Sequence, residues 1–148
     1  MLAKDIMTRK VITIKRETSV KEIIDILLKN RITGVPVVDD ENKIVGIVSE
    51  SDLIYKETSM PISDYWTDRK KFKNEYWKIK STKAEEIMTT DVICVGGDTP
   101  VEEIATLMIE KRIKRLPVVR GKELVGIISR ADVLKTILSE PSRSTPRW

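Results

Sequence analysis

Residues 4–55 read KDIMTRKVITIKRETSVKEIIDILLKNRITGVPVVDDENKIVGIVSESDLIY, and residues 85–135 read EEIMTTDVICVGGDTPVEEIATLMIEKRIKRLPVVRGKELVGIISRADVLK. The two stretches match, in order, at Ile6-Met7-Thr8 with Ile87-Met88-Thr89, Arg31-Ile32 with Arg112-Ile113, Pro36-Val37-Val38 with Pro117-Val118-Val119, Val45-Gly46-Ile47 with Val125-Gly126-Ile127, and Ser49 and Asp52 with Ser129 and Asp132. The register slips by one residue in the turn after the Pro-Val-Val run, where a change of length is tolerated best. The chain is therefore a tandem repeat of one unit of about 50 residues.

Each repeat predicts the same order of elements. A short strand (11–14 or 92–95) precedes a helix with a cap at its start: Ser19 with Glu22 in the first repeat, and Thr99 followed by Pro100 and Glu102 in the second. Two β-branched runs then predict a hairpin, and a closing helix follows. The hairpin strands are 35–38 with 44–48 and 116–119 with 124–128, their turns are 39–42 and 120–122, and the closing helices carry Leu53-Ile54 and Val133-Leu134.

The pattern predicts a mixed α/β (α+β) fold of two pseudo-symmetric β-α-β-β-α repeats. A repeat of about 50 residues is near the lower limit for an independent core. Its strands are nearly all apolar, so both faces of each sheet need cover. We therefore expect the repeats to pack sheet to sheet and to leave a ligand cleft between them. The expected organisation is repeat 1 (1–55), an insert (56–83), repeat 2 (84–138) and a flexible tail (139–148).

Composition excludes several classes of protein. The chain has no histidine, which excludes Ser-His-Asp and Cys-His catalytic arrangements and the usual histidine-containing zinc sites. We find no P-loop or dinucleotide fingerprint either, so an enzyme is not expected. The one cysteine, Cys94, permits no internal disulfide, and a reducing cytoplasm is the expected location. No run approaches the length of a membrane span, and no membrane partner is expected.

The ordered motifs of each repeat resemble a CBS domain, the module named after cystathionine β-synthase. The matching pieces are DIMT and EIMT, RITGVPVV and RIKRLPVV, and VGIVSESD and VGIISRAD, which occur twice in tandem. The resemblance implies a tandem CBS pair that binds AMP, ADP, ATP or S-adenosylmethionine, forms a homodimer, and regulates a protein target in trans, as in energy sensing. Separately, the sequence shows no metal-ligand cluster, and neither a metal site nor a catalytic cofactor is expected.

The family's Ser/Thr-x-x-Asp motif falls on Ser49 and Asp52 and on Ser129 and Asp132. A carboxylate at the start of a helix can accept both ribose hydroxyls, and the serine with nearby helix N–H groups can meet a phosphate. The alternative is that each serine caps the closing helix and each aspartate only suits its first turn. The family's base-slot positions fall on Ile12, Ile32, Thr33, Gly34, Pro36, Ile93, Ile113 and Pro117, and the alternative for the isoleucines is core packing.

The two repeats carry different charges at this motif. Lys114 and Arg115 stand where the first repeat has Thr33 and Gly34, and Arg130 stands where it has Glu50. The second repeat is therefore expected to prefer nucleotide phosphates. The Ser49/Asp52 site is expected to be empty or to take a ligand with an uncharged or cationic tail, such as S-adenosylmethionine. The alternative is that the three basic side chains form a solvated surface patch.

The insert breaks the internal symmetry. Stretch 55–77 holds six of the chain's seven aromatic residues, and lysines interleave with them. Basic residues interleaved with aromatic residues are typical of surfaces that bind single-stranded nucleic acid or an acidic partner. Alternatively, an aromatic helix face, with Ser63 as its cap, packs on the repeats or on a second subunit while the lysines face water. Three functions thus remain open: a nucleotide-sensing regulatory module, an interaction or dimerisation scaffold without a ligand, and a nucleic-acid binder acting through the insert.

Overall fold

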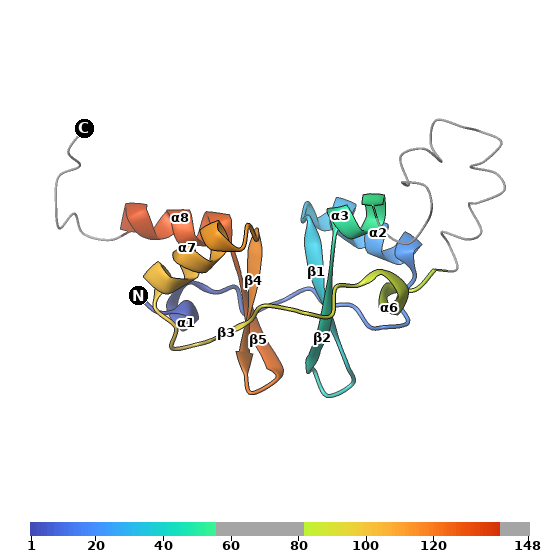
Figure 1. Ribbon diagram of the computed structural model, residues 1–148, viewed down its shortest axis with the longest axis horizontal. Coiled ribbons are helices and arrows are strands. Elements are labelled where there is room, and N and C mark those ends of the chain that lie inside the picture. The colour runs from blue at the N-terminus through green and yellow to red at the C-terminus, as the bar shows by residue number, and fades with distance from the viewer. Residues whose placement is uncertain (56–81, 140–148) are drawn as a thin grey trace. The chain divides into compact units, whose positions relative to one another are not determined.

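The computed structural model describes residues 1–55 and 82–139 and divides the chain into two compact units (Figure 1). The first-repeat unit is Ile12–Val92, and the second-repeat unit is Met1–Val11 with Ile93–Trp148. The predicted aromatic helix of the insert and the predicted flexible tail lie almost wholly outside the described residues. Each unit is a mixture of helices and a small sheet, as the repeat pattern predicts.

The first-repeat unit is built on an antiparallel hairpin of β1 (Gly34–Val38) and β2 (Ile44–Ser49), with Gly34 opposite Ser49. Helix α2 (Val20–Asn30) precedes the hairpin, and α3 (Glu50–Tyr55) follows it directly. Ser19 caps α2, because its side chain accepts a hydrogen bond from the Glu22 N–H at 3.2 Å, which confirms the predicted cap. The core contains the apolar faces of α2 and the hairpin: Ile23, Leu27, Val35, Val37 and Val48.

The second-repeat unit has the same plan. Its sheet has the order β3-β4-β5, in which β3 (Val95–Gly96) pairs parallel to β4 (Arg115–Arg120) and β4 pairs antiparallel to β5 (Glu123–Ser129). Helices α7 (Val101–Glu110) and α8 (Arg130–Ser139) flank this hairpin in the chain. Its core contains Val95, Ile104, Met108, Leu116, Val118 and Ile128.

The compact units and the sequence repeats divide the chain differently, because each unit includes a segment from the other repeat. Helix α1 (Ala3–Ile6) packs in the second-repeat core, where Ala3 is fully buried, and Thr8 exchanges two backbone hydrogen bonds with Ile127 at 2.9 and 3.0 Å. Helix α6 (Ala84–Ile87) packs in the first-repeat core, and Thr89 exchanges two bonds of 2.9 Å with Ile47. We call residues 1–11 and 82–92 the exchanged segments.

Glycines on the hairpins make room for the exchanged segments. A Cβ at Gly126 would lie 2.8 Å from the Met7 Cγ, closer than real Cβ atoms come to a neighbouring atom, and 3.0 Å from the Met7 Cβ, which is unusually tight. A Cβ at Gly46 would lie 2.6 Å from the Met88 Sδ. The repeated Ile-Met-Thr and Val-Gly-Ile motifs are thus the two sides of one docking contact, which occurs once in each unit.

Three local predictions differ from the structure. The strand predicted at 11–14 is reduced to a parallel bridge from Ile14 to Val37, and that predicted at 92–95 is observed only as Val95–Gly96. In both stretches the chain passes from one unit to the other at Val11/Ile12 or Val92/Ile93, so only the last residues can join a sheet. Thr99 does not cap α7, because Pro100 is the cap residue, with ψ 144°, and forms a bridge with Leu2.

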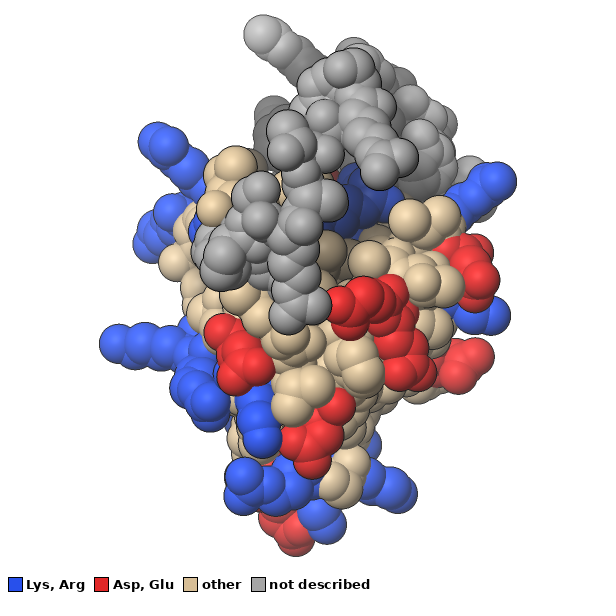
Figure 2. Space-filling model, turned by 90° about the vertical axis from the view of Figure 1, so that its left-hand side faces the viewer, with Lys and Arg blue, Asp and Glu red and all other residues tan. Residues whose placement is uncertain are grey.

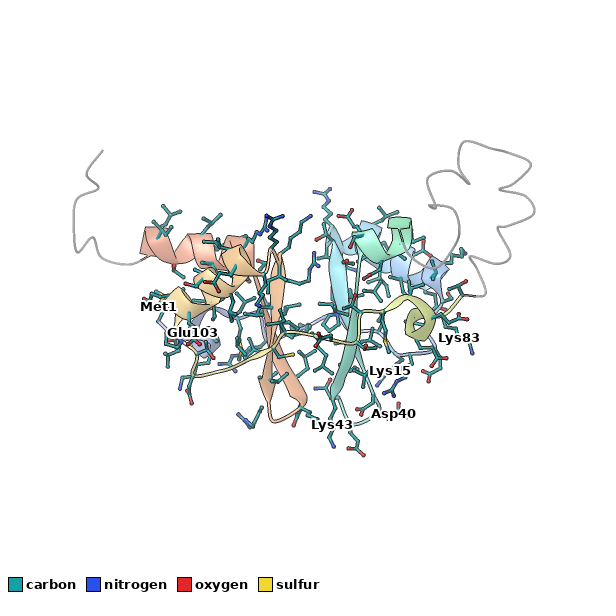
Figure 3. All side chains as sticks on the ribbon, in the orientation of Figure 1. Met1, Lys15, Asp40, Lys43, Lys83 and Glu103 are labelled. Atoms are coloured by element: carbon teal, nitrogen blue, oxygen red, sulfur yellow. The ribbon has the colours of Figure 1, made fainter. Side chains whose placement is uncertain are left out.

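The first hairpin turn is stabilised by Asp39. Its Oδ1 accepts the backbone N–H groups of Glu41 and Lys43, both at 2.9 Å, and its carbonyl accepts the Lys15 Nζ at 2.8 Å. Figure 3 shows Lys15, Asp40 and Lys43 gathered at this end of the hairpin, and the Lys15 Nζ lies 3.7 Å from an Asp40 carboxylate oxygen. The Lys43 N–H holds the pKa of Asp39 below its usual value.

Candidate functional site

The second-repeat Ser-x-x-Asp turn, residues 129–132, lies where β5 passes into α8. The Asp132 Oδ2 accepts the Ser129 N–H at 2.8 Å and the Ser129 hydroxyl at 3.1 Å. The Asp132 N–H donates to the Ser129 Oγ at 3.3 Å, which completes a capping box. Within the described part of the chain, no hydrogen bond to the Asp132 Oδ1 is seen, and the side chain is half-buried. Ser129 therefore caps α8, and the capping bonds leave one carboxylate oxygen of Asp132 for a ligand, so the capping and ribose-binding roles are compatible.

The first-repeat turn, residues 49–52, is held more tightly. The Asp52 Oδ2 accepts the Ser49 N–H at 2.8 Å and the Ser49 hydroxyl at 3.2 Å. The Asp52 Oδ1 accepts the Thr89 hydroxyl at 3.3 Å, and only 6% of the residue is exposed. Both carboxylate oxygens of Asp52 thus accept hydrogen bonds within the unit, whereas among the described residues only the Oδ2 of Asp132 does so.

Hydrogen bonds bring the predicted basic residues to the Asp132 turn. The Arg130 N–H donates to the Lys114 carbonyl at 3.2 Å, and the Arg130 Nε donates to the Ile113 carbonyl at 3.4 Å. The strand register sets Arg115 directly opposite Ser129. In the first repeat, the corresponding bond runs from the Glu50 N–H to the Thr33 carbonyl at 3.0 Å, with no basic residue at these positions. The charge difference predicted from the sequence is therefore a difference between two structurally equivalent turns.

The predicted base-slot residues divide between the units. Ile12, Ile32, Thr33, Gly34 and Pro36 lie in the first-repeat unit, and Ile93, Ile113 and Pro117 lie in the second. Ile32 is partly buried against the first-repeat core, and Ile93 and Ile113 against the second, as the core-packing alternative expects. Gly34, Pro36 and Pro117 are buried, whereas 38% of Ile12 is exposed. The base-slot role of these positions stays a prediction.

Comparison with known proteins identifies the family. The CBS domain model matches residues 3–58 and again residues 84–139. The chain belongs to the CBS-domain family. The chain is 30% identical over 162 residues to the uncharacterized protein MJ1426 of Methanocaldococcus jannaschii, an alignment that covers 93% of this chain and 92% of that protein. Other curated relatives are longer, and the chain spans between 22% and 63% of their length.

Solved CBS structures share the fold. The structure of CBSX2 in complex with AMP matches with a TM-score of 0.73 at 28% identity, covering 93% of this chain and 96% of that one. The CBS domain pair of protein MJ0100, in complex with 5-methylthioadenosine and S-adenosyl-L-methionine, matches with a TM-score of 0.70 at 30% identity, covering 93% and 95%. The predicted fold class, two tandem CBS repeats of mixed α and β structure, is confirmed.

Sequence reasoning missed Thr89, which belongs to the second CBS motif in the sequence yet contacts the Asp52 carboxylate of the first. The Ile-Met-Thr motif was visible in both repeats, but it carried no signal of which hairpin each copy would join. The contact of Thr89 with Asp52 can be predicted only once segment 82–92 is known to pack in the first-repeat unit.

The remaining surface and side-chain groups add little to this site. On the face drawn in Figure 2, Lys and Arg side chains are interspersed with Asp and Glu. Among residues 1–55 and 82–139, no group of three or more His, Cys, Asp or Glu side chains could hold a metal ion. Over the same residues, no helix has the length and hydropathy of a membrane span. Burial raises the pKa of the half-buried Cys94 thiol, which fits a packing role.

Proposed function

We propose that this CBS pair is a non-catalytic regulatory module that binds an adenosine-containing nucleotide (AMP, ADP, ATP or S-adenosylmethionine) at its Ser-x-x-Asp turns. It then signals to a protein target in trans, in a reducing cytoplasm. The CBS structures that carry AMP, 5-methylthioadenosine and S-adenosylmethionine support the ligand class, since all three contain adenosine.

The observation that carries the proposal is the state of the Asp132 carboxylate. Its Oδ2 is fixed by two bonds from Ser129, so the group is held in one orientation at the start of α8. Its Oδ1 lies on a half-buried side chain and is available to accept a ribose hydroxyl. A carboxylate that is fixed before binding loses little rotamer entropy when the ligand arrives.

The basic residues beside this turn favour a phosphorylated ligand. Lys114 and Arg130 are exposed and joined through a backbone hydrogen bond, and Arg115 lies opposite Ser129 in the sheet. Lysine and arginine make charge-assisted hydrogen bonds to phosphate that are stronger than neutral ones. We therefore expect AMP, ADP or ATP at the Asp132 turn, and no strong anion preference at the Asp52 turn.

Calorimetric titration with AMP tests the proposal. Charge-assisted hydrogen bonds contribute about 1.5–3 kcal/mol each, so Asp132→Ala should weaken AMP binding by about tenfold to a hundredfold. Asp98→Ala removes the same charge from an exposed residue of the same unit and should leave the affinity unchanged. Absence of binding by the natural chain to AMP, ATP and S-adenosylmethionine would refute the proposal. So would an unaltered affinity in Asp132→Ala.

A specific surface favours the second candidate function, a dimerisation or interaction scaffold. Four aliphatic side chains of the second-repeat unit are between 63% and 88% exposed: Ile109 of α7 and Leu134, Ile137 and Leu138 of α8. In the first-repeat unit, Leu28 is the equivalent of Ile109 and is 74% exposed. Exposed aliphatic groups on neighbouring helices are typical of interaction surfaces. A homodimer through these helices is part of the proposal. Sedimentation analysis of Leu138→Glu, which should shift a dimer towards monomer, tests it.

Nucleic-acid binding would depend on the insert, which lies outside the described residues.

A further inference from the structure

Thr89 competes for the carboxylate oxygen that a ligand at the first-repeat turn would use. Its hydroxyl donates to the Asp52 Oδ1 at 3.3 Å, while Ser49 holds the Oδ2. Its backbone is fixed on β2 by two bonds of 2.9 Å to Ile47, so the hydroxyl stays within reach of the carboxylate. Thr89 arrives on the exchanged segment 82–92, from the second repeat of the sequence.

The bond is weak enough to be displaced. Hydroxyl-to-carboxylate bonds are usually 2.5–3.0 Å long, and 3.3 Å lies beyond that range. A ligand hydroxyl free to take its own position can reach a shorter distance and replace the one from Thr89. The Ser49 bonds to the Oδ2 need not change, so the carboxylate keeps its orientation during the replacement.

The second repeat lacks this competition. Thr8 is the sequence equivalent of Thr89 and makes the same two backbone bonds, here to Ile127. Across the described residues, however, the Thr8 hydroxyl makes no hydrogen bond to Asp132, and Thr8 is exposed whereas Thr89 is half-buried. The two turns are therefore alike in sequence and different in the state of their carboxylates.

We infer that the Thr89 hydroxyl competes with a ligand hydroxyl for the Asp52 Oδ1 and so lowers the affinity of the first-repeat turn for an adenosine ligand. The inference rests on the proposed function and adds a positioning residue that regulates one of its two turns. A net hydrogen bond contributes about 1 kcal/mol, so the competition lowers affinity about fivefold. Ligand binding at this turn would also release one contact of the exchanged segment 82–92.

The test first weakens AMP binding at the second-repeat turn and then removes the competitor at the first-repeat turn. AMP binding is measured by calorimetry in Asp132→Ala and in Asp132→Ala with Thr89→Val, which keeps the shape of the side chain and removes its hydroxyl. The second variant should bind AMP about fivefold more tightly. Thr89→Ser, which keeps a hydroxyl, should leave the affinity as it is, and so should Thr8→Val, which makes the same change at the equivalent position. Thermal unfolding of each variant shows that it is folded.

The outcomes separate the inference from the proposed function. If the natural chain binds AMP but Thr89→Val leaves binding at the first-repeat turn unchanged, weaker or still undetectable, the inference is wrong and the proposed function stands. If the natural chain binds no adenosine ligand, both are wrong. A gain in affinity on removing a hydroxyl is the decisive result, since a residue with only a structural role would lower the affinity when changed.

Discussion

Replacing Gly126 with alanine tests how the first eleven residues dock on the second CBS repeat. Gly126 lies within β5, where alanine would ordinarily stabilise a strand by about 0.5–1 kcal/mol relative to glycine. Here the added Cβ would stand 2.8 Å from the Met7 Cγ and 3.0 Å from its Cβ. We therefore expect the opposite sign, a loss of about 1–3 kcal/mol, as for other overpacked contacts.

Urea unfolding followed by circular dichroism measures this loss, and Tm should fall by about 2–4 °C for each kcal/mol in a chain of this size. Gly96→Ala is the matched control, because a Cβ there meets nothing within 4 Å, and it should be neutral or stabilising. The double variant Met7→Ala with Gly126→Ala should recover part of the loss, with a coupling energy of about 1 kcal/mol. Stabilisation by Gly126→Ala, or full additivity of the two changes, would refute the docking of segment 1–11 on this strand.

Three further predictions concern local structure. The pKa of Asp39 is lowered from 3.8 in the folded protein, so its carboxylate stabilises the fold above about pH 4, and this contribution is lost as the pH falls through the lowered pKa. Asp39→Asn should therefore flatten the acid limb of a curve of Tm against pH. An unaltered acid limb would contradict this. Ser19→Ala should lower the free energy of unfolding, measured in urea, by about 1 kcal/mol, because it removes the cap of α2. Thr99→Ala should change it by no more than about 0.5 kcal/mol, because Thr99 is not the cap of α7. Equal losses in the two variants would show that the caps are assigned wrongly. Gly121 has a φ of 62°, in the left-handed region, so Gly121→Val should lower the free energy of unfolding by about 1–2 kcal/mol. Gly121→Asn should be tolerated, because Asn42 adopts the same φ of 62° in the first hairpin turn. Similar Tm values for the two variants would argue against a left-handed turn.

The sequence predicted what depends on neighbours in the chain. The hairpins follow from β-branched runs broken at Asn42 and Gly121, and the Ser19 cap follows from a spacing of three residues. The one-residue slip between repeats is also local: residues 39–43 lie between the paired Val38 and Ile44, whereas residues 120–123 lie between the equivalent pair, Val119 and Leu124. These features are decided within a few residues, so a single sequence suffices to predict them.

Features that depend on distant partners were not predicted. Ile-Met-Thr occurs twice, Val-Gly-Ile occurs twice, and the apolar chemistry of both pairings is the same, so the pattern cannot say which copy joins which hairpin. The contact between Thr89 and Asp52 spans 37 positions and follows only from that choice. The strand predicted at 11–14 was wrong for the same reason, since an apolar run can also be a crossing between units.

The exchanged segments have a consequence for the synthesis of this protein. A nascent chain that has emerged as far as the first hairpin still lacks segment 82–92, whose Ala84 and Ile87 complete that hairpin's core, while its own segment 1–11 must await β5. Neither half can mature before the other is made. For the same reason, cleavage between residues 56 and 81 would yield two fragments that each carry a piece the other needs, and such fragments should reassemble when mixed.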